Sequence, residues 1–312
     1  MTSVLKTNAG VGLNKTIPAI LPGDKVGLVS PAGPVKKEQV QESLDILDQL
    51  KLRYEFGKHA FLDKGLVSAS VKDRIADINY FLSREEIKAI WALRGGYGSM
   101  QLLKKFNYSL LEEKPKLFVG FSDLTALQWS IFKETGIPSL SGLTLTFQLS
   151  RKNPYVALGM DMLSGRRTNI SGGDIKGKIQ IVTPGEAAGI FIGGTLSMIC
   201  SLCGTPYFPD RDNFILFLED VNEPLYRIAR YFEQLALADF WSKVKGVILG
   251  QFLFEERPLK VASILVHFLP ASIPIISNFP YGHQTKCIPL PQGVKARFQT
   301  DLFELKWNSF VE

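Results

Sequence analysis

The sequence has few of the residues that bind metals or form disulfides. It contains three cysteines and three histidines among 312 residues: Cys200, Cys203, Cys287, His59, His267 and His283. An odd number of cysteines argues against a disulfide framework and is typical of the reducing cytoplasm. These scattered ligands do not assemble into a tetrahedral zinc set, so we expect no metal and no other cofactor.

Cys200 and Cys203 have the spacing of a redox pair, but they stand at the end of an apolar helical run. A redox pair needs a helix N-terminus, where the thiolate is stabilised. We therefore expect these two cysteines to pack in the core.

Long uninterrupted apolar runs are also missing. The most apolar late stretch, residues 261–277, is broken by His267, Pro270 and Pro274, so it does not predict a membrane span. Residues 1–15 are polar and lack the apolar core of a signal peptide. We expect a cytoplasmic protein without a membrane partner.

Charge of one sign is not concentrated anywhere. The formal net charge is +6, but the lysines are spread along the chain, as on a solvated surface. Nucleic-acid-binding motifs are absent, so a nucleic-acid partner is not expected. The charge balance would favour an anionic substrate without requiring one.

The length corresponds to one large or two medium domains. In residues 1–150, short apolar strands alternate with amphipathic helices, which predicts a parallel sheet with helices on both faces. Residues 151–177 are rich in Gly, Asn, Arg and Ser, and we interpret them as a linker. Residues 178–312 predict a second, mixed α/β domain, with strands expected at 178–182, 189–192, 214–218, 244–249 and 273–276, and helices at 196–202, 224–238 and 259–268.

The stretch around Ser122 organises the first domain. An apolar run from Leu117 ends in Gly-Phe-Ser-Asp, and a helical pattern follows at once. A strand that turns sharply into a helix presents the turn residue at the sheet edge where α/β folds bind ligands, beside free helix N–H groups. This is the geometry of a nucleophile elbow. The alternative is that Ser122 is only a helix N-cap.

The glycine-rich segment 94–99 ends the strand that precedes the serine strand, so it is expected beside Ser122. One interpretation is a phosphate-binding loop, but the segment lacks the Gly-Lys-Ser/Thr of that motif. Another interpretation is an oxyanion hole, in which the N–H groups of Gly96 and Asp123 point at one oxygen. An ordinary glycine turn is the third possibility.

An acid and a histidine also stand at strand exits. Glu219 and Asp220 directly follow an apolar strand, where an acid either begins a loop or orients a histidine. His283 lies in a turn-rich loop just after a strand, which suits a general base, whereas His59 lies in a polar loop and His267 in a helical pattern.

Six segments together resemble the LD-carboxypeptidase family of serine peptidases, which includes muramoyltetrapeptide carboxypeptidases and microcin C immunity peptidases. They are Arg94-Gly-Gly-Tyr-Gly-Ser99, Gly120-Phe-Ser-Asp-Leu-Thr125, Gly193-Gly-Thr-Leu-Ser197, Gly204-Thr-Pro-Tyr207, Leu216-Phe-Leu-Glu-Asp220 and Phe279-Pro-Tyr-Gly-His283. The resemblance runs from about Pro22 to the C-terminus. It implies a flavodoxin-like N-terminal domain, a separate C-terminal domain, an active site at their junction and a homodimer. It also implies a Ser-Glu-His triad, formed here by Ser122, Glu219 and His283.

The expected reaction is release of C-terminal D-alanine from a murein tetrapeptide during peptidoglycan recycling, with Arg94 as a clamp for the substrate carboxylate. Two alternatives stay open: a microcin-immunity-like peptidase acting on peptidyl-nucleotide amides, and a non-catalytic module that binds a nucleotide or phosphate. The chain departs from the family pattern at Thr195, where Asn is common, at Ala229, where an acid is common, and at residues 142–145, where a His-Gly-Pro-like segment is common.

Overall fold

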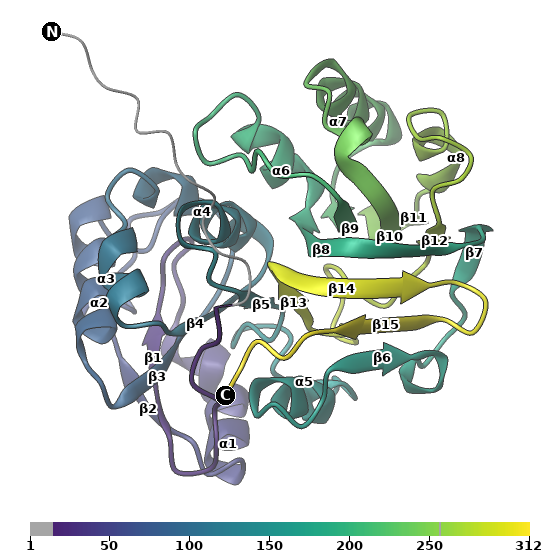
Figure 1. The fold of residues 1–312 in the computed structure, drawn as a ribbon. Helices are drawn as coiled ribbons and strands as arrows, with labels where there is room; N and C mark the ends of the chain where they lie inside the picture. Colours follow the sequence, from purple (N-terminus) through teal and green to yellow (C-terminus); the bar gives the residue numbers. More distant parts are fainter. Residues whose placement is uncertain (1–14, 256) are drawn as a thin grey trace, which may run out of the picture.

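The structure, a computed structural model, describes residues 15–255 and 257–312. The expectation that residues 1–15 contain no leader therefore lies outside the described residues, apart from Lys15. The described chain forms two β-sheets that stand side by side, each with its own helices (Figure 1). None of its helices is both long enough and apolar enough to traverse a lipid bilayer.

The first sheet has six strands in the order β13-β5-β4-β3-β1-β2, all parallel except β13. Its strands are β1 (Lys25–Val29), β2 (Arg53–Phe56), β3 (Ile87–Ala92), β4 (Leu117–Gly120), β5 (Ser139–Ser141) and β13 (Leu290–Gln292). The central strands are almost wholly buried, as parallel strands covered on both faces must be.

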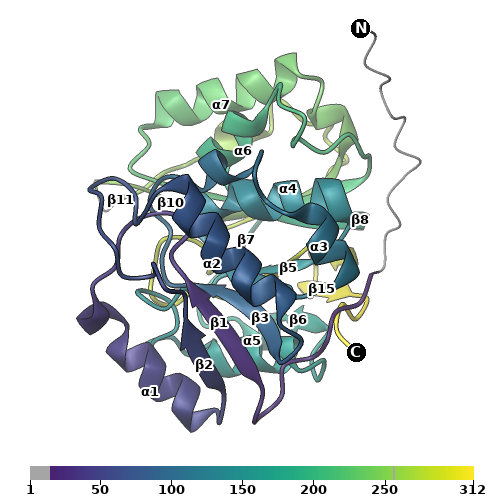
Figure 2. The ribbon, with the colours of Figure 1, turned by 90° about the vertical axis from the view of Figure 1, so that its left-hand side faces the viewer.

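Helices cover this sheet on two faces (Figures 1 and 2). They are α1 (Gln41–Gln49), α2 (Val71–Ser83), α3 (Tyr108–Glu113) and α4 (Thr125–Thr135), with 3₁₀ turns η1 (Lys37–Val40), η2 (Ser99–Leu102) and η3 (Ser122–Leu124). Helix α2 lies close on the strands because Gly27 of β1 leaves room for the ring of Phe81. The predicted parallel sheet with flanking helices is confirmed.

The second sheet has nine strands, ordered β6-β15-β14-β8-β9-β10-β12-β7 with β11 paired to β10. They are β6 (Asn169–Ser171), β7 (Gln180–Thr183), β8 (Glu186–Thr195), β9 (Phe214–Val221), β10 (Val244–Phe254), β11 (Arg257–Pro258), β12 (Ile275–Ser277), β14 (Val294–Gln299) and β15 (Glu304–Trp307). Strands β8, β9, β10 and β12 run parallel, and the others are antiparallel to their neighbours. The sheet is therefore mixed, as predicted.

The second sheet carries α6 (Leu196–Leu202), α7 (Leu225–Leu237) and α8 (Ala262–Leu265) on one face, as Figure 1 shows. The remaining elements are α5 (Val156–Leu163) and the 3₁₀ turns η4 (Gly172–Asp174) and η5 (Trp241–Lys243). Helices α6 and α7 match the predicted positions, whereas α8 is shorter than the predicted helix 259–268. Residues 151–177, interpreted as a linker, contain α5 and β6. The division of the chain into domains at residues 150 and 178 stays a prediction.

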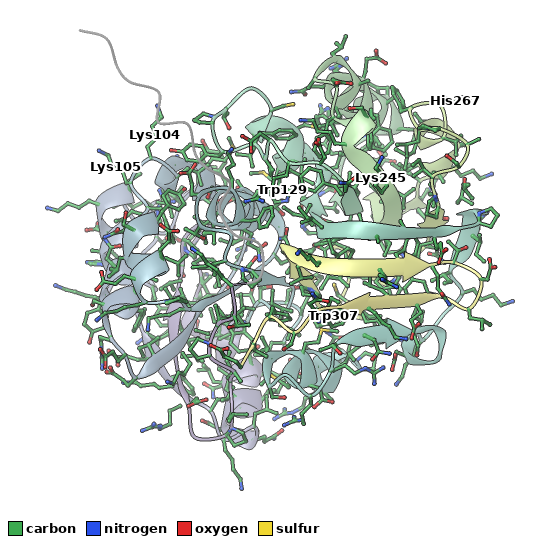
Figure 3. The ribbon with its side chains drawn as sticks, in the orientation of Figure 1. Lys104, Lys105, Trp129, Lys245, His267 and Trp307 are labelled. Carbon is green, nitrogen blue, oxygen red and sulfur yellow. The ribbon has the colours of Figure 1, made fainter. Side chains whose placement is uncertain are left out.

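Strand β13 ties the two sheets together. It follows the loop that leaves β12 of the second sheet, and it pairs antiparallel with β5 of the first. The Gln292 side chain accepts the Gly193 N–H at 3.3 Å and donates to Gln128 of α4 at 2.9 Å. Trp129, which lies between the two halves in Figure 3, donates its indole N–H to the Gly193 carbonyl at 2.7 Å. Buried polar contacts therefore join α4 and β13 to the end of β8.

Candidate active site

Ser122 lies at the turn between β4 and the helical segment that leads into α4. Its φ is +65°, a left-handed conformation that costs a non-glycine residue roughly 1–2 kcal/mol. The surrounding structure must enforce such a conformation, and it is common at functional sites. Ser122 caps neither helical segment, because the N-cap residues are Phe121 and Leu124. The elbow expected from the sequence is present, and the N-cap alternative is wrong.

The Ser122 hydroxyl instead contacts a histidine that is 161 positions away in the chain. Ser122 Oγ and His283 Nε2 are 2.8 Å apart. On the other side of the ring, His283 Nδ1 lies 2.7 Å from Glu219 Oε2. The structure therefore brings together the serine, histidine and glutamate that the sequence analysis selected, in one continuous hydrogen-bonded chain.

Each of these side chains has a distinct environment. Glu219 is completely buried near the end of β9, whereas the His283 side chain keeps 21% of its surface exposed. Ser122 is partly exposed. The acid is therefore shielded from water, while the histidine and the serine hydroxyl remain reachable by a ligand.

Electrostatics in the site favour a charged histidine. Burial lowers the pKa of His283, but the charge and the hydrogen bond of Glu219 outweigh it, with a further contribution from the Asp220 charge, so the net pKa is raised above 6.5. Asp220 is itself unusual: burial, followed by repulsion from Glu219, raises its pKa to about 7. Its carboxylate accepts the backbone N–H groups of Ser197 and Val221.

Glycines let the loop at 94–99 approach the serine. A Cβ on Gly95 would lie 2.8 Å from Ser122 Cβ and 3.0 Å from the Phe121 carbonyl oxygen. The next residue, Gly96, has φ +109° and packs against Gly33, whose N–H donates to the Gly95 carbonyl at 3.0 Å. The glycine loop therefore lies directly beside Ser122, as the sequence predicts.

A buried arginine stabilises this loop through hydrogen bonds. Arg74 of α2 donates to the carbonyls of Pro31 and Gly98 at 2.8 and 2.9 Å. Asp123 accepts the Ser99 N–H at 2.8 Å, and the Ser99 hydroxyl donates to the Asp123 carbonyl. Burial, only partly offset by these hydrogen bonds and by the Arg74 charge, raises the pKa of the Asp123 carboxyl. The side chain of Asp123 thus supports the loop rather than facing a ligand.

The sequence analysis missed Arg74, although a signal exists. Arg74 lies four and seven positions before Ile78 and Phe81, so helical periodicity places it on the buried face of α2. A lone arginine on an apolar helix face must find hydrogen-bond acceptors when it is buried. Here those acceptors are the Pro31 carbonyl, in the loop after β1, and the Gly98 carbonyl, in the glycine loop beside Ser122.

The other candidate residues are not part of the hydrogen-bonded chain of Ser122, His283 and Glu219. Arg94 is exposed, and its guanidinium donates to the Pro34 carbonyl at 3.3 Å. His59 pairs with Asp77 at 2.8 Å, and His267 is exposed at the outer end of the α8 region (Figure 3). All three cysteines are free, and Cys200 packs in the core. Within residues 15–255 and 257–312, no three His, Cys, Asp or Glu side chains gather as metal ligands.

Comparison with known proteins assigns the chain to a family. Sequence profiles of the LD-carboxypeptidase N-terminal domain and the LD-carboxypeptidase C-terminal domain match residues 26–142 and 188–298. The chain belongs to the LD-carboxypeptidase family.

Individual relatives agree with this assignment. The chain is 28% identical over 296 residues to a probable murein peptide carboxypeptidase of Bacillus subtilis (strain 168), covering 92% of each protein. It is 31% identical over 287 residues to a putative carboxypeptidase of Synechocystis sp., covering 90% of this chain and 93% of the relative. Among solved structures, MccF in complex with glutamyl sulfamoyl guanosine has a TM-score of 0.86 at 21% identity, covering 95% of this chain and 99% of that one. The last similarity concerns the fold alone.

The departures from the LD-carboxypeptidase pattern lie in different surroundings. Thr195 is buried and donates its hydroxyl to Glu219 Oε1 at 2.5 Å. Residues 142–145 are buried, and the Leu143 carbonyl accepts the indole N–H of Trp91. Ala229 lies part-buried on α7. Only the first of these departures touches the hydrogen-bonded chain.

Proposed function

We propose that this LD-carboxypeptidase family member is a serine carboxypeptidase whose triad is Ser122, His283 and Glu219. The observation that carries the proposal is the continuous hydrogen-bonded chain from a strained, partly exposed serine to a buried glutamate. A hydroxyl within hydrogen-bond reach of a base, itself oriented by a third group, is the arrangement of an activated nucleophile.

The reaction follows from these positions. His283 Nε2 takes the Ser122 proton as Oγ attacks the peptide carbonyl, and an acyl-enzyme forms when that proton is returned to the leaving amine. Water then attacks the acyl-enzyme carbonyl while His283 takes its proton. The proton returns to Ser122 Oγ, and the shortened peptide is released. Glu219 holds the imidazole in the tautomer that accepts at Nε2 and stabilises its charged form.

The developing oxyanion would be stabilised by the N–H groups of Gly96 and Asp123. Both belong to segments that meet at Ser122, and Arg74 and the Ser99–Asp123 contacts hold them there. One such donor is typically worth about 3 kcal/mol of the activation barrier. The donors are backbone groups, so side-chain substitutions at these positions act only through loop geometry.

The proposed substrate is a murein tetrapeptide, from which the enzyme would release C-terminal D-alanine in the cytoplasm during peptidoglycan recycling. The name of the Bacillus subtilis relative, a probable murein peptide carboxypeptidase, supports this substrate class. An exopeptidase must bind a free carboxylate, and we assign that role to Arg94, the exposed cation of the glycine loop. We further propose that the enzyme acts as a homodimer without a metal or other cofactor.

A second candidate is hydrolysis of a peptidyl-nucleotide amide. It is favoured by the fold similarity to MccF, whose structure holds glutamyl sulfamoyl guanosine. A non-catalytic nucleotide- or phosphate-binding module is disfavoured, because such a module has no use for a serine held in hydrogen-bond contact with a histidine-glutamate pair.

The test is mass spectrometry of the purified protein incubated with L-Ala-γ-D-Glu-meso-diaminopimelyl-D-Ala, and in parallel with glutamyl sulfamoyl guanosine. Ser122→Ala removes the proposed nucleophile, and Ser130→Ala is the matched control, since Ser130 is a buried serine of α4 whose hydroxyl donates to the Leu127 carbonyl of its own helix. Loss of one D-Ala with wild type and Ser130→Ala, but not with Ser122→Ala, is the expected result. Cleavage of the nucleotide amide alone would establish the second candidate, and activity in Ser122→Ala would overturn both.

A further inference from the structure

The inference concerns Thr195, the last residue of β8. In the parallel pairing of β8 with β9, Thr195 lies opposite Glu219. Its hydroxyl donates to Glu219 Oε1 at 2.5 Å, while Glu219 Oε2 faces His283 Nδ1. Both Thr195 and Glu219 are buried. Among the described residues, Thr195 and His283 are the two side chains that hydrogen-bond this carboxylate.

A second contact joins Thr195 to the helix that follows the nucleophile. The Thr195 backbone N–H donates to Thr125 Oγ1 at 3.2 Å, and Thr125 is the first residue of α4, three positions after Ser122. Strand β8 approaches α4 this closely because Gly194, at φ +131°, has no Cβ to clash with the Thr125 side chain. Four hydrogen bonds therefore link Ser122 to His283, Glu219, Thr195 and Thr125 in turn. The backbone from Thr125 to Ser122 closes the ring.

We propose that Thr195 is a positioning residue that fixes the rotation of the Glu219 carboxylate through its hydroxyl. A fully buried carboxylate with one unsatisfied oxygen would turn toward any available donor, because an unpaired charge is costly in a water-excluded site. With Oε1 held by Thr195, the other oxygen stays aimed at His283. The proposal rests on the proposed function, in which Glu219 orients the base.

Substitutions separate this role from simple packing. Thr195→Val keeps the shape of the side chain and loses the hydroxyl, whereas Thr195→Ser keeps the hydroxyl and loses the methyl group. If Thr195 only fills space, valine is the milder change. If the hydroxyl holds Glu219, serine is the milder change. Thr135→Val is a matched control, because Thr135 is a buried threonine at the other end of α4 whose hydroxyl donates to the Ile131 carbonyl.

The first measurement does not depend on the substrate. The proton on His283 Nδ1, shared with Glu219, gives a far-downfield proton NMR signal that His283→Ala removes and so assigns. We expect Thr195→Val to broaden or lose this signal through faster exchange with water, and Thr195→Ser and Thr135→Val to keep it. An unchanged signal in Thr195→Val overturns the proposal, as does a wild type without the signal.

The second measurement is kcat and KM for D-alanine release. Thr195→Val is expected to lower kcat about tenfold to a hundredfold, the range for losing a hydrogen bond to a charged group, with KM changed less than about twofold. Thr195→Ser should recover most of kcat. In a Glu219→Gln background, Thr195→Val should cost much less than in wild type, because both changes disable the same orienting unit. Equal costs in the two backgrounds would mean that Thr195 acts independently of Glu219.

The outcomes distinguish this inference from the function on which it rests. A wild type that shows the expected NMR pattern but releases no D-alanine contradicts the proposed substrate and leaves the role of Thr195 standing. An active wild type in which Thr195→Val is neutral contradicts the role of Thr195 alone. Thermal melts check folding, and Thr195→Ala, which also lacks the hydroxyl, replaces Thr195→Val if that variant does not fold.

Discussion

The hydroxyl groups of Tyr281 and Ser141 lie 2.7 Å apart, and both residues are fully buried. Ser141 ends β5 of the first sheet, and Tyr281 stands two positions before His283. The Tyr281 ring also packs edge-on against Phe121 and Phe217, at centroid distances of 5.6 and 5.0 Å. One aromatic side chain therefore contacts the neighbours of Ser122 and Glu219 and anchors the loop that carries His283.

Tyr281→Phe removes this bond and leaves the Ser141 hydroxyl buried without its partner. We expect the free energy of unfolding to fall by about 1–2 kcal/mol, the cost of an unsatisfied buried group. Ser141→Ala added to Tyr281→Phe should cost little more, because the bond is already lost. Urea denaturation of the two single variants and the double variant measures this coupling, and strictly additive losses would contradict it.

Glu219→Gln tests the orienting role of the acid. Gln cannot hold the imidazole in the same tautomer or stabilise its charge, so kcat should fall by orders of magnitude, about 10⁴-fold in the analogous serine protease substitution. KM should change little, since Glu219 is completely buried and does not face the substrate. Steady-state kinetics decide this, and comparable losses in kcat and in substrate affinity would argue against the assignment.

The pH dependence of kcat/KM should report His283. The base must be neutral to accept the Ser122 proton, so activity should fall as the pH drops through the His283 pKa, which the Glu219 charge and hydrogen bond raise above 6.5 despite burial. Asp220 contributes to this increase. Asp220→Asn removes that charge, so the acidic limb should move to lower pH, by a small amount because a pKa of about 7 leaves the Asp220 carboxyl partly protonated in this range. Rate profiles from pH 5 to 9 for both proteins provide the comparison; a shift to higher pH would be inconsistent with the site electrostatics.

Gly95→Ala should displace Ser122, the proposed nucleophile. The added Cβ would lie 2.8 Å from Ser122 Cβ, closer than real contacts allow. We expect at least a tenfold loss of kcat, since small misplacements of reacting groups cost about a hundredfold in rate. Gly173→Ala is the control, because a Cβ there meets only Ser171 Oγ at an ordinary 3.8 Å. Normal kcat in Gly95→Ala would show that the loop can retreat from Ser122 without consequence.

Ser122→Gly and Ser122→Ala should both be inactive but differ in stability. At φ +65°, alanine keeps the left-handed strain of the native serine and glycine does not. The strain costs about 1–2 kcal/mol, and the greater entropy of an unfolded glycine offsets part of it, so Ser122→Gly should be more stable by up to about 1 kcal/mol. Thermal unfolding of the two variants measures the difference. A less stable glycine variant would mean that the elbow is not strained.

The local patterns of the sequence single out the candidate residues at strand ends but leave their roles open. Ser122, Glu219 and His283 each follow an apolar run, and the chemistry of a strand exit is visible without the fold. The distances among them are not, because they are separated by up to 161 positions and depend on how two sheets pack. The resemblance of six segments to the LD-carboxypeptidase family, and not periodicity, predicted that these three residues form one site.

Other parts were missed for physical reasons. Strand β13 is three residues long and contains Pro291, and its partner β5 lies about 150 positions earlier, so nothing local marks it as a strand. Arg74 has a helical signal, but its acceptors are loop carbonyls that the sequence does not bring together. The β14 segment is different: its alternating burial from Val294 to Gln299 matches a period of two and could have been read as a strand.

Strand β13 also bears on how the protein forms during synthesis. The sheet that carries Ser122 is completed by residues 290–292, which leave the ribosome long after β1 to β5. Until then β5 is paired with β4 on one side only, and His283, the proposed base, has only just been made. A nascent chain or a product truncated before β13 would thus present an unfinished sheet edge, prone to pairing with other chains. Completion of this sheet and assembly of the hydrogen-bonded chain are therefore both coupled to the synthesis of residues 283–292.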